Sequence, residues 1–301
     1  MGLDLRKLDH LVAVVEEGSF TRAAARLHLS QQALSTSIRA LEREVGVPLL
    51  DRTSAGVTPL PAGRALVEDA RVLHGVARAA VRRARRIGRG ETEVLRIGHT
   101  PAVTGPEVMA LAQAVPGLHT EVHQRYPGQL TAELLGGELD VGLCRGIQPP
   151  HGLSRTTLGH SRLSVAVAAG HRLAGRTHVT LADLAGEHLV VWGSEDSGYT
   201  QFLLGLCRDA GFEPRHSRNP IQGTPPVTAV VGTGHVAFVT DPPGSALDGR
   251  VQVLELRPAQ HAPVHALWSA NHTGAMRDAF LSGQPASPAA ARSDATNRSG
   301  R

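Results

Sequence analysis

Apolar residues recur at helical spacing in three segments within the first 45 residues of the chain. The first segment covers residues 4–17, and the second is a short, alanine-rich stretch over residues 20–28. The pattern predicts a third helix that ends near residue 45, joined to the second by a tight turn. Its apolar stripe consists of Leu34, Ile38, Leu41 and Val45.

The opposite face of the third helix lacks the Glu and Lys of an ordinary solvated helix. Two short helices joined by a tight turn, the second of them amphipathic, are typical of a helix-turn-helix. A helix that enters the major groove must bring hydrogen-bonding groups to base edges without placing anionic side chains against phosphate. The stretch 49–60 then predicts a hairpin-like wing with Gly56 near its tip. The polar face of the third helix consists of Gln32, Ser35, Thr36, Arg39 and Arg43.

One long helix is predicted from about residue 61 to residue 89. A lone helix of this length cannot bury its apolar stripe, so a heptad repeat predicts pairing with a helix of another subunit. The repeat consists of Leu66, Leu73, Ala80 and Ile87, with Ala62, Val76 and Ala84 near the alternate positions. The helix ends in a run of arginines, which is more often a solvated face than a DNA contact. These are Arg82, Arg83, Arg85, Arg86 and Arg89.

The pattern changes after residues 87–93, which have the composition of a linker. Short β-rich runs follow at residues 94–100, 139–145, 163–169, 188–193, 236–240, 251–256 and 264–270. Helical stretches lie between several of them, at residues 107–114, 129–136, 199–210 and 226–231. This alternation predicts an α/β fold with a mostly parallel sheet, in which ligands bind at the carboxyl ends of the strands. Residues 284–301 contain no large apolar residue and are expected to be disordered.

Charge is divided unevenly along the chain. Residues 1–90 carry 15 Lys and Arg against 9 Asp and Glu, whereas residues 91–301 carry 16 against 18. This is the electrostatic footprint expected when one domain meets nucleic acid and another does not.

Composition limits the location of the protein and the chemistry of its cysteines. The 301 residues, 41% of them hydrophobic, can form two or three domains with sizeable cores. Apolar runs stay below the roughly 18 residues of a membrane span, and the start MGLDLRKLDH lacks the apolar block of a signal peptide. We therefore expect a cytoplasmic protein without membrane association. Cys144 and Cys207 are too few for a disulfide framework, which leaves two ordinary thiols or a redox switch.

The stretch LVAVVEEGSFTRAAARLHLSQQALSTSIRALEREVGVPLLDR, followed by PAG at the head of the long helix, resembles LysR-type transcriptional regulators. The resemblance continues through LRIG, GELDVGL, LVVW and GTGHVAFV, and covers residues 3 to about 283. The chain departs from it at Ser30-Gln31-Gln32, where the family usually has Ser-Gln-Pro.

The resemblance implies a domain plan. A winged helix-turn-helix DNA-binding domain occupies residues 1–60, and a linker (dimerisation) helix occupies residues 61–90. Residues 91–283 form an effector-binding domain of two α/β lobes that resembles periplasmic binding proteins. Lobe I comprises about residues 91–160 and 262–283, lobe II comprises about residues 161–261, and residues 284–301 are the disordered tail.

Within this motif the polar face of the third helix is expected to contact DNA. Gln can bond an adenine bidentately, Ser and Thr can serve either partner, and Arg can reach guanine or phosphate. A merely solvated position is the alternative for each Gln, Ser and Thr. We expect base contacts from Gln31, Gln32, Ser35 and Thr36, and base or backbone contacts from Arg39 and Arg43. Backbone contacts are expected from Thr21, Arg22 and Ser30, and a phosphate or minor-groove contact from Arg52.

The resemblance also implies a small molecule in the cleft between the lobes. Arg145 would suit an anionic ligand through bidentate pairing, with a surface ion pair or a lobe–lobe contact as the alternative. Thr100 lies in a loop that leads into the next helix, whose N–H groups attract anions. The full set of candidate effector-binding residues is His99, Thr100, Pro101, Arg145, Ser194, Ser197, Gln222, Gly223 and Thr224.

No cofactor, metal site or catalytic constellation is expected. Two H-x₃-H pairs, His119/His123 and His261/His265, lie in β-like stretches, where residues i and i+4 are far apart. Ser194 lacks the G-x-S-x-G context of a nucleophile, and VGTGH lacks the full G-x-G-x-x-G pattern of a dinucleotide site.

The sequence thus predicts a sequence-specific DNA-binding transcriptional regulator of the LysR type, controlled by a small-molecule effector, and not an enzyme. The expected partners are a double-stranded DNA operator, an effector of unknown identity and further copies of the chain, as a homodimer or a dimer of dimers. RNA polymerase is a further candidate. The alternative is a small-molecule binding or transport protein with an incidental N-terminal module. An α/β enzyme would need a nucleophile–base constellation.

Overall fold

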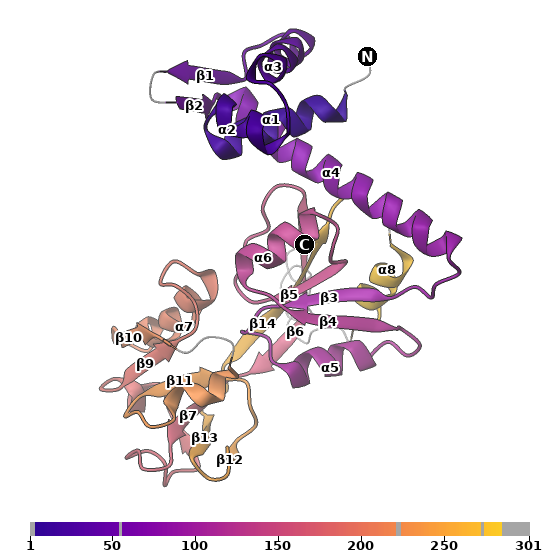
Figure 1. Cartoon of the computed structure of the whole chain (residues 1–301). Coiled ribbons are helices and arrows are strands. Elements are labelled where there is room, and N and C mark those ends of the chain that lie inside the picture. Colours follow the sequence, from indigo (N-terminus) through magenta and orange to yellow (C-terminus); the bar gives the residue numbers. More distant parts are fainter. Residues whose placement is uncertain (1–3, 54–55, 221–223, 272–273, 285–301) are drawn as a thin grey trace, which may run out of the picture.

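The structure is a computed structural model that describes residues 4–53, 56–220, 224–271 and 274–284. Figure 1 shows a small helical head, a long helix that leaves it, and two lobes that each contain their own sheet. Two of the expected effector-binding residues, Gln222 and Gly223, lie outside the described residues, as does the expected disordered tail beyond Gln284.

The head contains the three predicted helices and the predicted wing. Asp4, Ser19 and Ser30 are extended N-caps whose side chains each accept a backbone N–H of the helix that follows. Gly18 and Gly46 end two of the helices in the left-handed conformation, which glycine adopts without steric cost. The elements are α1 (Leu5–Glu17), α2 (Phe20–Arg26), α3 (Gln31–Val45), β1 (Leu50–Thr53) and β2 (Gly56–Pro59), with β1 and β2 antiparallel.

One apolar residue of the third helix is not where the periodicity predicts. Leu34, Ile38 and Leu41 are fully buried in the core of the head, but Val45 is 40% exposed. Val45 is the last residue of α3, and α3 ends there at the left-handed Gly46. The stripe that fixes α3 therefore consists of three residues.

The long helix α4 (Pro61–Gly88) packs on its own chain mainly with residues outside the heptad stripe, although Leu66 of that stripe packs against the core of the head. Its N-terminal part contributes Val67 and Ala70 to the core of the head. Further along, Gly75 is packed so closely against helix α6 (Pro127–Leu135) that a Cβ placed on it would lie 1.7 Å from the Leu135 carbonyl oxygen. Within the heptad stripe, Leu73 remains 43% exposed and Ile87 70% exposed.

Lobe I is built on a five-stranded sheet with the order β4-β3-β5-β14-β6. The parallel core β3, β4 and β5 is continued by antiparallel pairing of β14 with β5 and β6. The strands are β3 (Leu95–His99), β4 (Thr120–Gln124), β5 (Val141–Cys144), β6 (Leu153–Arg162) and β14 (His261–Ser269). Helices α5 (Gly105–Gln113), α6 and α8 (Ala275–Ser282) belong to the same lobe (Figure 1).

Lobe II is built on a seven-stranded sheet with the order β10-β9-β11-β7-β13-β12, in which β8 also pairs with β13. Its strands are β7 (Ser164–Ala168), β8 (His178–Val179), β9 (His188–Val191), β10 (Arg215–Arg218), β11 (Val236–Val239), β12 (Gly244–Ala246) and β13 (Val251–Leu256). Its helices are α7 (Gly198–Asp209) and the short 3₁₀ turns η1 (Ala182–Leu184) and η2 (Pro226–Val230). Its main core lies between the sheet and α7.

The prediction of a mostly parallel sheet is wrong, because both sheets are mixed. In lobe II, β9 pairs in parallel with β10 and β11, whereas β7 is antiparallel to β11 and β13. The reason is the route of the chain, which enters lobe II from β6 and returns to lobe I in β14. These two strands run antiparallel side by side, with Arg162 opposite His261.

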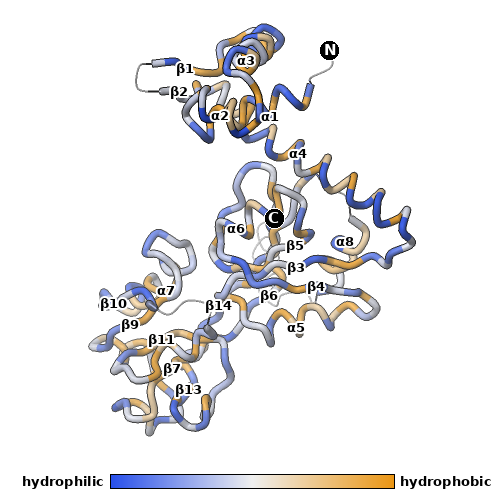
Figure 2. The backbone as a smooth tube through the Cα atoms, viewed as in Figure 1, coloured by the Kyte–Doolittle hydropathy of each residue, from blue (hydrophilic) through white to orange (hydrophobic). Residues whose placement is uncertain are grey.

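Hydropathy follows this architecture. Figure 2 shows apolar positions along strands of lobe II such as β7, β11 and β13, and polar positions along the far half of α4. Among the described residues, no helix is both long enough and apolar enough to cross a membrane.

Candidate nucleic-acid interface and ligand cleft

The polar face of helix α3 contains exposed side chains that bond to no other residue of the described chain. Gln31, Gln32 and Arg39 are exposed, and within the described residues their side chains have no hydrogen-bond or ion-pair partner. The opposite face is held by the fully buried Leu34 and Ile38, so the helix has one orientation relative to the head. These amide and guanidinium groups are therefore free to bond to another molecule.

Other residues expected at the DNA are partly engaged within the chain. The Ser30 hydroxyl accepts the Ala33 N–H at 3.1 Å, so its first role is to cap α3. The Thr36 hydroxyl donates to the Gln32 carbonyl at 2.9 Å, and Arg43 Nε donates to the Arg39 carbonyl at 3.4 Å. All of these are bonds within one helix, and the side chains stay exposed.

Arg52 joins the wing to the third helix. Its guanidinium carbon lies 4.5 Å from the centre of the Phe20 ring, a cation–π contact, and its Nη1 donates to the Ser35 hydroxyl at 3.3 Å. The Glu42 carboxylate lies 3.9 Å away. These contacts hold Arg52, which lies in the first strand after α3, beside the polar face of that helix.

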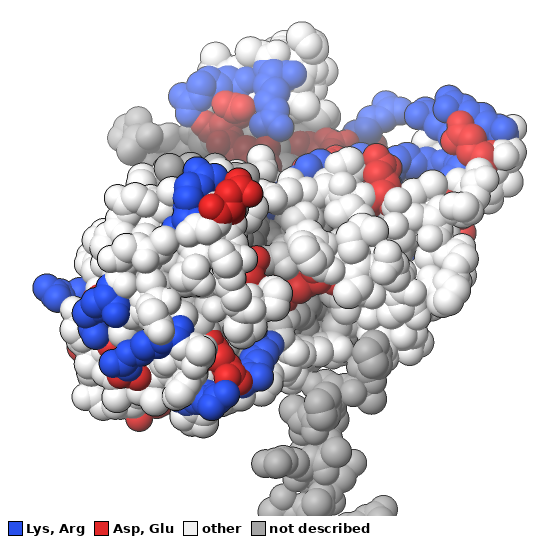
Figure 3. Space-filling view, turned by 90° about the horizontal axis from the view of Figure 1, so that it is seen from below, with Lys and Arg blue, Asp and Glu red and all other residues white. Residues whose placement is uncertain are grey.

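At the start of α2, Thr21 is exposed and Arg22 folds back onto the end of α1. The Arg22 guanidinium donates to the Glu17 carbonyl, and its Nε lies 3.7 Å from the Glu17 carboxylate. In the face seen in Figure 3, Lys and Arg side chains are prominent over the head and over the far end of α4, with Asp and Glu side chains beside them, and both signs are also mixed over the lobes.

A cavity of about 640 Å³ lies between the two lobes. It lies beyond the carboxyl ends of β3, β4, β5, β9 and β10, as expected for ligand sites in α/β sheets. Of the expected effector-binding residues, Thr100, Pro101, Arg145, Ser194 and Ser197 line it.

Two residues that line this cavity each have a buried polar atom without a hydrogen-bond partner within the described residues. These atoms are the Thr100 hydroxyl from lobe I and the Trp192 indole N–H from lobe II. A buried polar group without a partner costs about 1–3 kcal/mol. A ligand that bonds both atoms would remove that cost and join the lobes.

The structure corrects the role expected for Arg145. Its side chain is fully buried, and Nε donates to the Ala102 carbonyl at 2.9 Å and Nη1 to the Pro263 carbonyl at 3.0 Å. Nη2 donates to the Glu107 carboxylate at 2.5 Å and to the Ser161 hydroxyl at 2.9 Å. Because these bonds occupy most of its N–H groups, Arg145 is a structural residue at the wall of the cavity and has no free fork for an anion.

Glu107 is the anionic partner in this network. Burial opposes its ionisation, but the charge of Arg145 and hydrogen bonds from Ser161 and Thr104 outweigh burial and lower the pKa of Glu107. Glu107 also caps α5 by accepting the Thr104 N–H at 2.8 Å. The expectation that this helix end attracts an anionic ligand beside Thr100 is therefore wrong, because a carboxylate of the chain already occupies it.

Two further expected residues lie away from the cavity lining. His99 is 9% exposed, and its Nδ1 lies 2.8 Å from the Val103 carbonyl oxygen inside lobe I. Thr224 is bonded through its hydroxyl to Thr228 at 2.9 Å. Neither side chain lines the cavity.

Sequence reasoning missed most of the cavity wall. Tyr126 follows β4 and Arg218 is the last residue of β10, and the polar sequences of these two strands gave no strand signal. The remaining missed residues flank strand ends or the start of α7, and the rule that ligands bind at carboxyl ends could have found them. They are Ala102, Pro127, Gly146, Ile147, Gln148, Trp192, Gly193, Asp196, Gly198 and Tyr199.

A pair of glycines forms a backbone contact between the lobes beside the cavity. Gly146 follows β5 in lobe I and has a φ of +66°, and Gly198 begins α7 in lobe II. A Cβ on Gly146 would lie 2.2 Å from the Tyr199 nitrogen, and a Cβ on Gly198 would lie 2.1 Å from the Gly146 oxygen. Only glycine at both positions allows the lobes to approach this closely.

The two cysteines are both buried free thiols. Burial raises the pKa of Cys144 to about 12, and burial followed by the charge of Glu213 raises the pKa of Cys207 to about 11. The thiolate is the reactive form of cysteine, so both groups are protonated and shielded at neutral pH. Of the two interpretations left open by the sequence, these properties favour ordinary thiols.

Comparison with known proteins agrees with this arrangement. Residues 5–64 match the family described as "Bacterial regulatory helix-turn-helix protein, lysR family", and residues 88–282 match "LysR substrate binding domain". The chain is 36% identical over 222 residues to the uncharacterized HTH-type transcriptional regulator YnfL of Escherichia coli (strain K12), which covers 71% of this chain and 74% of that relative.

Two further proteins show the same relationship. The DNA-binding transcriptional dual regulator OxyR of Escherichia coli (strain K12) is 32% identical over 264 residues, which cover 85% of this chain and 86% of that relative. The crystal structure of full-length CbnR complexed with its target DNA has a TM-score of 0.53 and 22% identity, and covers 94% of this chain and 98% of that chain. The latter likeness shows a shared fold.

Proposed function

The chain belongs to the LysR family of DNA-binding transcriptional regulators with an effector-binding domain, and from this premise we propose which of its residues perform each task. Gln31, Gln32 and Arg39 on α3 contact bases, with Ser35, Thr36 and Arg43 beside them. Arg52, Ser30, Thr21 and Arg22 contact the DNA backbone or the minor groove. The observation that supports this proposal is the exposed face of α3, whose amides and guanidinium have no partner within the described chain.

The alternative of a transport protein with an incidental N-terminal module is disfavoured. The first 64 residues belong to the regulatory helix-turn-helix family, and the head shares core residues with α4, which also packs on lobe I. We propose that the protein is no enzyme and works in the cytoplasm, where its DNA is.

Gln32→Ala is expected to change the base preference at one operator position by about 1–3 kcal/mol, because a bidentate amide contact is lost. The measurement is a mobility shift on DNA from upstream of the gene and on single-base variants, with salt varied. Binding by both proteins should weaken steeply with salt, since phosphate contacts remain. Gln113→Ala, an exposed glutamine at the end of α5, is the matched control. If Gln32→Ala binds every sequence as the wild type does, the recognition face is misplaced.

We propose that the effector occupies the cavity between the lobes and bonds the Thr100 hydroxyl and the Trp192 N–H. Ser194 and Ser197 offer further hydroxyls from lobe II, while the prolines and aromatic rings of the lining exclude water. An effector that bonds both lobes favours one lobe arrangement by its differential affinity for the two states.

Thr100→Val is expected to abolish the response to the effector while leaving operator binding intact, since it removes one hydroxyl and conserves side-chain shape. A reporter under the natural promoter measures the response, and a mobility shift measures operator binding. Thr156→Val on β6, away from the cavity, is the matched control and should respond normally. Loss of operator binding together with the response would assign Thr100 to folding.

We propose that two copies pair through the exposed heptad face of α4, which includes Leu73, Ala80 and Ile87, and that two such dimers form a tetramer. The support is the exposure of these three residues, whereas Leu66, the first residue of the heptad, packs against the core of the head. An effector-dependent tetramer geometry would control DNA bending and the access of RNA polymerase. The division into residues 1–60, 61–90 and 91–283 belongs to the same proposal.

A further inference from the structure

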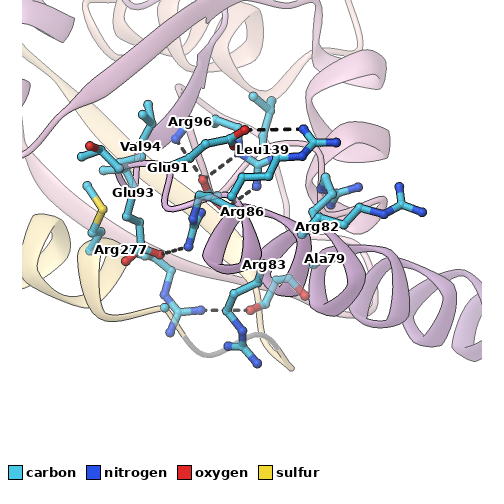
Figure 4. A pocket seen from close by; sticks show the side chains of 18 residues that line it. Ala79, Arg82, Arg83, Arg86, Glu91, Glu93, Val94, Arg96, Leu139 and Arg277 are labelled. Atoms are coloured by element: carbon cyan, nitrogen blue, oxygen red, sulfur yellow. Dashed lines mark hydrogen bonds and ion pairs between the residues drawn. The ribbon is translucent and has the colours of Figure 1, made fainter.

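A second cavity, of about 450 Å³, lies at the far end of α4 from the head. Figure 4 shows its lining from the last turns of α4, the segment that follows them, β3 and α8. Its apolar walls include Ala79, Val94, Leu139 and Met276. It shares no lining residue with the cavity between the lobes.

Guanidinium groups dominate the lining. Helix α4 contributes Arg82, Arg83, Arg85, Arg86 and Arg89. Arg96 from β3 and Arg277 from α8 approach from the other walls (Figure 4). Three carboxylates line the same cavity, so positive charge is in excess.

The carboxylates of the lining are already committed. Arg86 pairs with Glu93 at 2.7 Å, and Arg89 pairs with Glu91 at 3.4 Å. The third carboxylate, Asp140, receives Arg96 at 2.8 Å and 3.1 Å. Arg277, which also lines the cavity, lies 2.5 Å from the carboxylate of Asp278, a residue outside the lining.

Of the arginines that line this cavity, three on α4 have no ion pair among the described residues. Arg83 and Arg85 are exposed, and their side chains have no hydrogen bond or ion pair there. Arg82 donates to the Gly137 carbonyl, but its Nε is buried and has no partner. Burial first, and then the neighbouring charges of Arg96 and Arg78, lower the pKa of Arg82, although the charges of Glu138 and Asp140 act in the opposite direction. Like charges held this close are destabilising until an anion neutralises them.

The arginines at the end of α4 are too far from α3 to contact the same stretch of DNA. The 28 residues of α4 span about 40 Å at the rise of an α-helix, and the arginines occupy its last turns, whereas the head packs on its first turns. The excess charge therefore faces a different ligand from that of α3.

We propose that this cavity binds a small phosphate-rich anion with a diphosphate group. Among the three arginines without an ion pair, those at positions 82 and 85 are neighbours on the helix surface, so their two forks can each take one phosphate. A diphosphate carries about the charge that Arg82, Arg83 and Arg85 leave uncompensated. The volume suits a small molecule and not a protein segment. The anion bridges α4 to β3 and α8, and so fastens the linker helix to lobe I.

The test is titration calorimetry of the full-length protein with pyrophosphate at low salt. We expect one site per chain, and at least tenfold weaker binding by the double variant Arg83→Gln/Arg85→Gln. Both positions are exposed on a helix, so the variant should fold, and its melting temperature checks this. The matched control is Arg39→Gln/Arg43→Gln on α3, which loses the same charge from the other basic region and should bind pyrophosphate as the wild type does.

Several results would overturn the proposal. The first is that the wild type does not bind pyrophosphate. This result is expected if carboxylates of a second copy of the chain fill the cavity. Equal losses in both double variants would show unspecific attraction to positive charge. Citrate binding as tight as pyrophosphate would refute the preference for phosphate. Failure of the DNA or effector proposals would leave this result unchanged, since the cavity uses none of their residues.

Discussion

Gly146→Ala should lower the free energy of unfolding by about 2–5 kcal/mol. Part of the loss, about 1–2 kcal/mol, comes from the left-handed backbone at φ +66°, which disfavours a Cβ. The rest comes from the clash of that Cβ with the Tyr199 nitrogen of lobe II, at 2.2 Å. Urea unfolding followed by tryptophan fluorescence measures the change, since Trp192 lies in lobe II and Trp268 lies in lobe I.

Gly117→Ala is the control that separates the two causes. Gly117 has a φ of +83°, and a Cβ placed on it meets no atom within 4 Å. It should therefore show the backbone cost alone, about 1–2 kcal/mol. Equal losses at both positions would mean that the lobes are apart in solution, and the cavity between them would then need a different account.

Gly75→Ala should destabilise the contact between α4 and lobe I by about 1–3 kcal/mol or more. Its Cβ would lie 1.7 Å from the Leu135 carbonyl oxygen, and a backbone atom cannot rotate away as a flexible side chain can. The helix must shift, which disturbs the bonds from Arg78 and Arg82 to the carbonyls of Gly136 and Gly137. Urea unfolding together with hydrogen exchange in α6 measures the loss.

The same helix supplies the control for this prediction. A Cβ on Gly88 meets no atom within 4 Å, so Gly88→Ala should be neutral or stabilising by up to about 1 kcal/mol. A Gly75→Ala protein as stable as wild type, with unchanged exchange in α6, would show that α4 does not rest on lobe I in solution.

The head was predictable because its signals are local. Ser19 and Ser30 are N-caps, Gly18 and Gly46 end helices, and the spacing of Leu34, Ile38 and Leu41 fixes the buried face of α3. Each signal acts over a few residues, so no distant contact could override it. The same holds for the start of α4 at Pro61, a residue that favours the first turn of a helix.

The sheets were less predictable, because several strands derive their stability from neighbours distant in sequence. Strands β4, β6 and β10 have polar sequences and few fully buried side chains, so periodicity gives no strand signal. Their backbone groups bond to β3, β14 and β9, respectively, and each of these partner strands is separated from them in the sequence by other elements. Antiparallel pairing in both sheets likewise depends on the route of the chain and not on local composition.

The prediction of site residues was incomplete for a related reason. Residue type predicts what a side chain can bond, but not whether the fold has already used it. Arg145 has the chemistry for an anion, yet Glu107 and Ser161 come from other segments and occupy its guanidinium. Thr100 is the converse case, because its hydroxyl is buried and still lacks a partner within the described residues.

Arg162 and His261 lie opposite each other, and the Leu163 N–H donates to the Gln260 carbonyl at 2.8 Å, where the chain leaves lobe I and where it returns. Lobe II is thus an insertion whose two ends meet. A short turn between β6 and β14 could replace it without changing the strand order of lobe I. Evolution can exchange such a module for another that recognises a different signal, while the head and α4 are inherited unchanged.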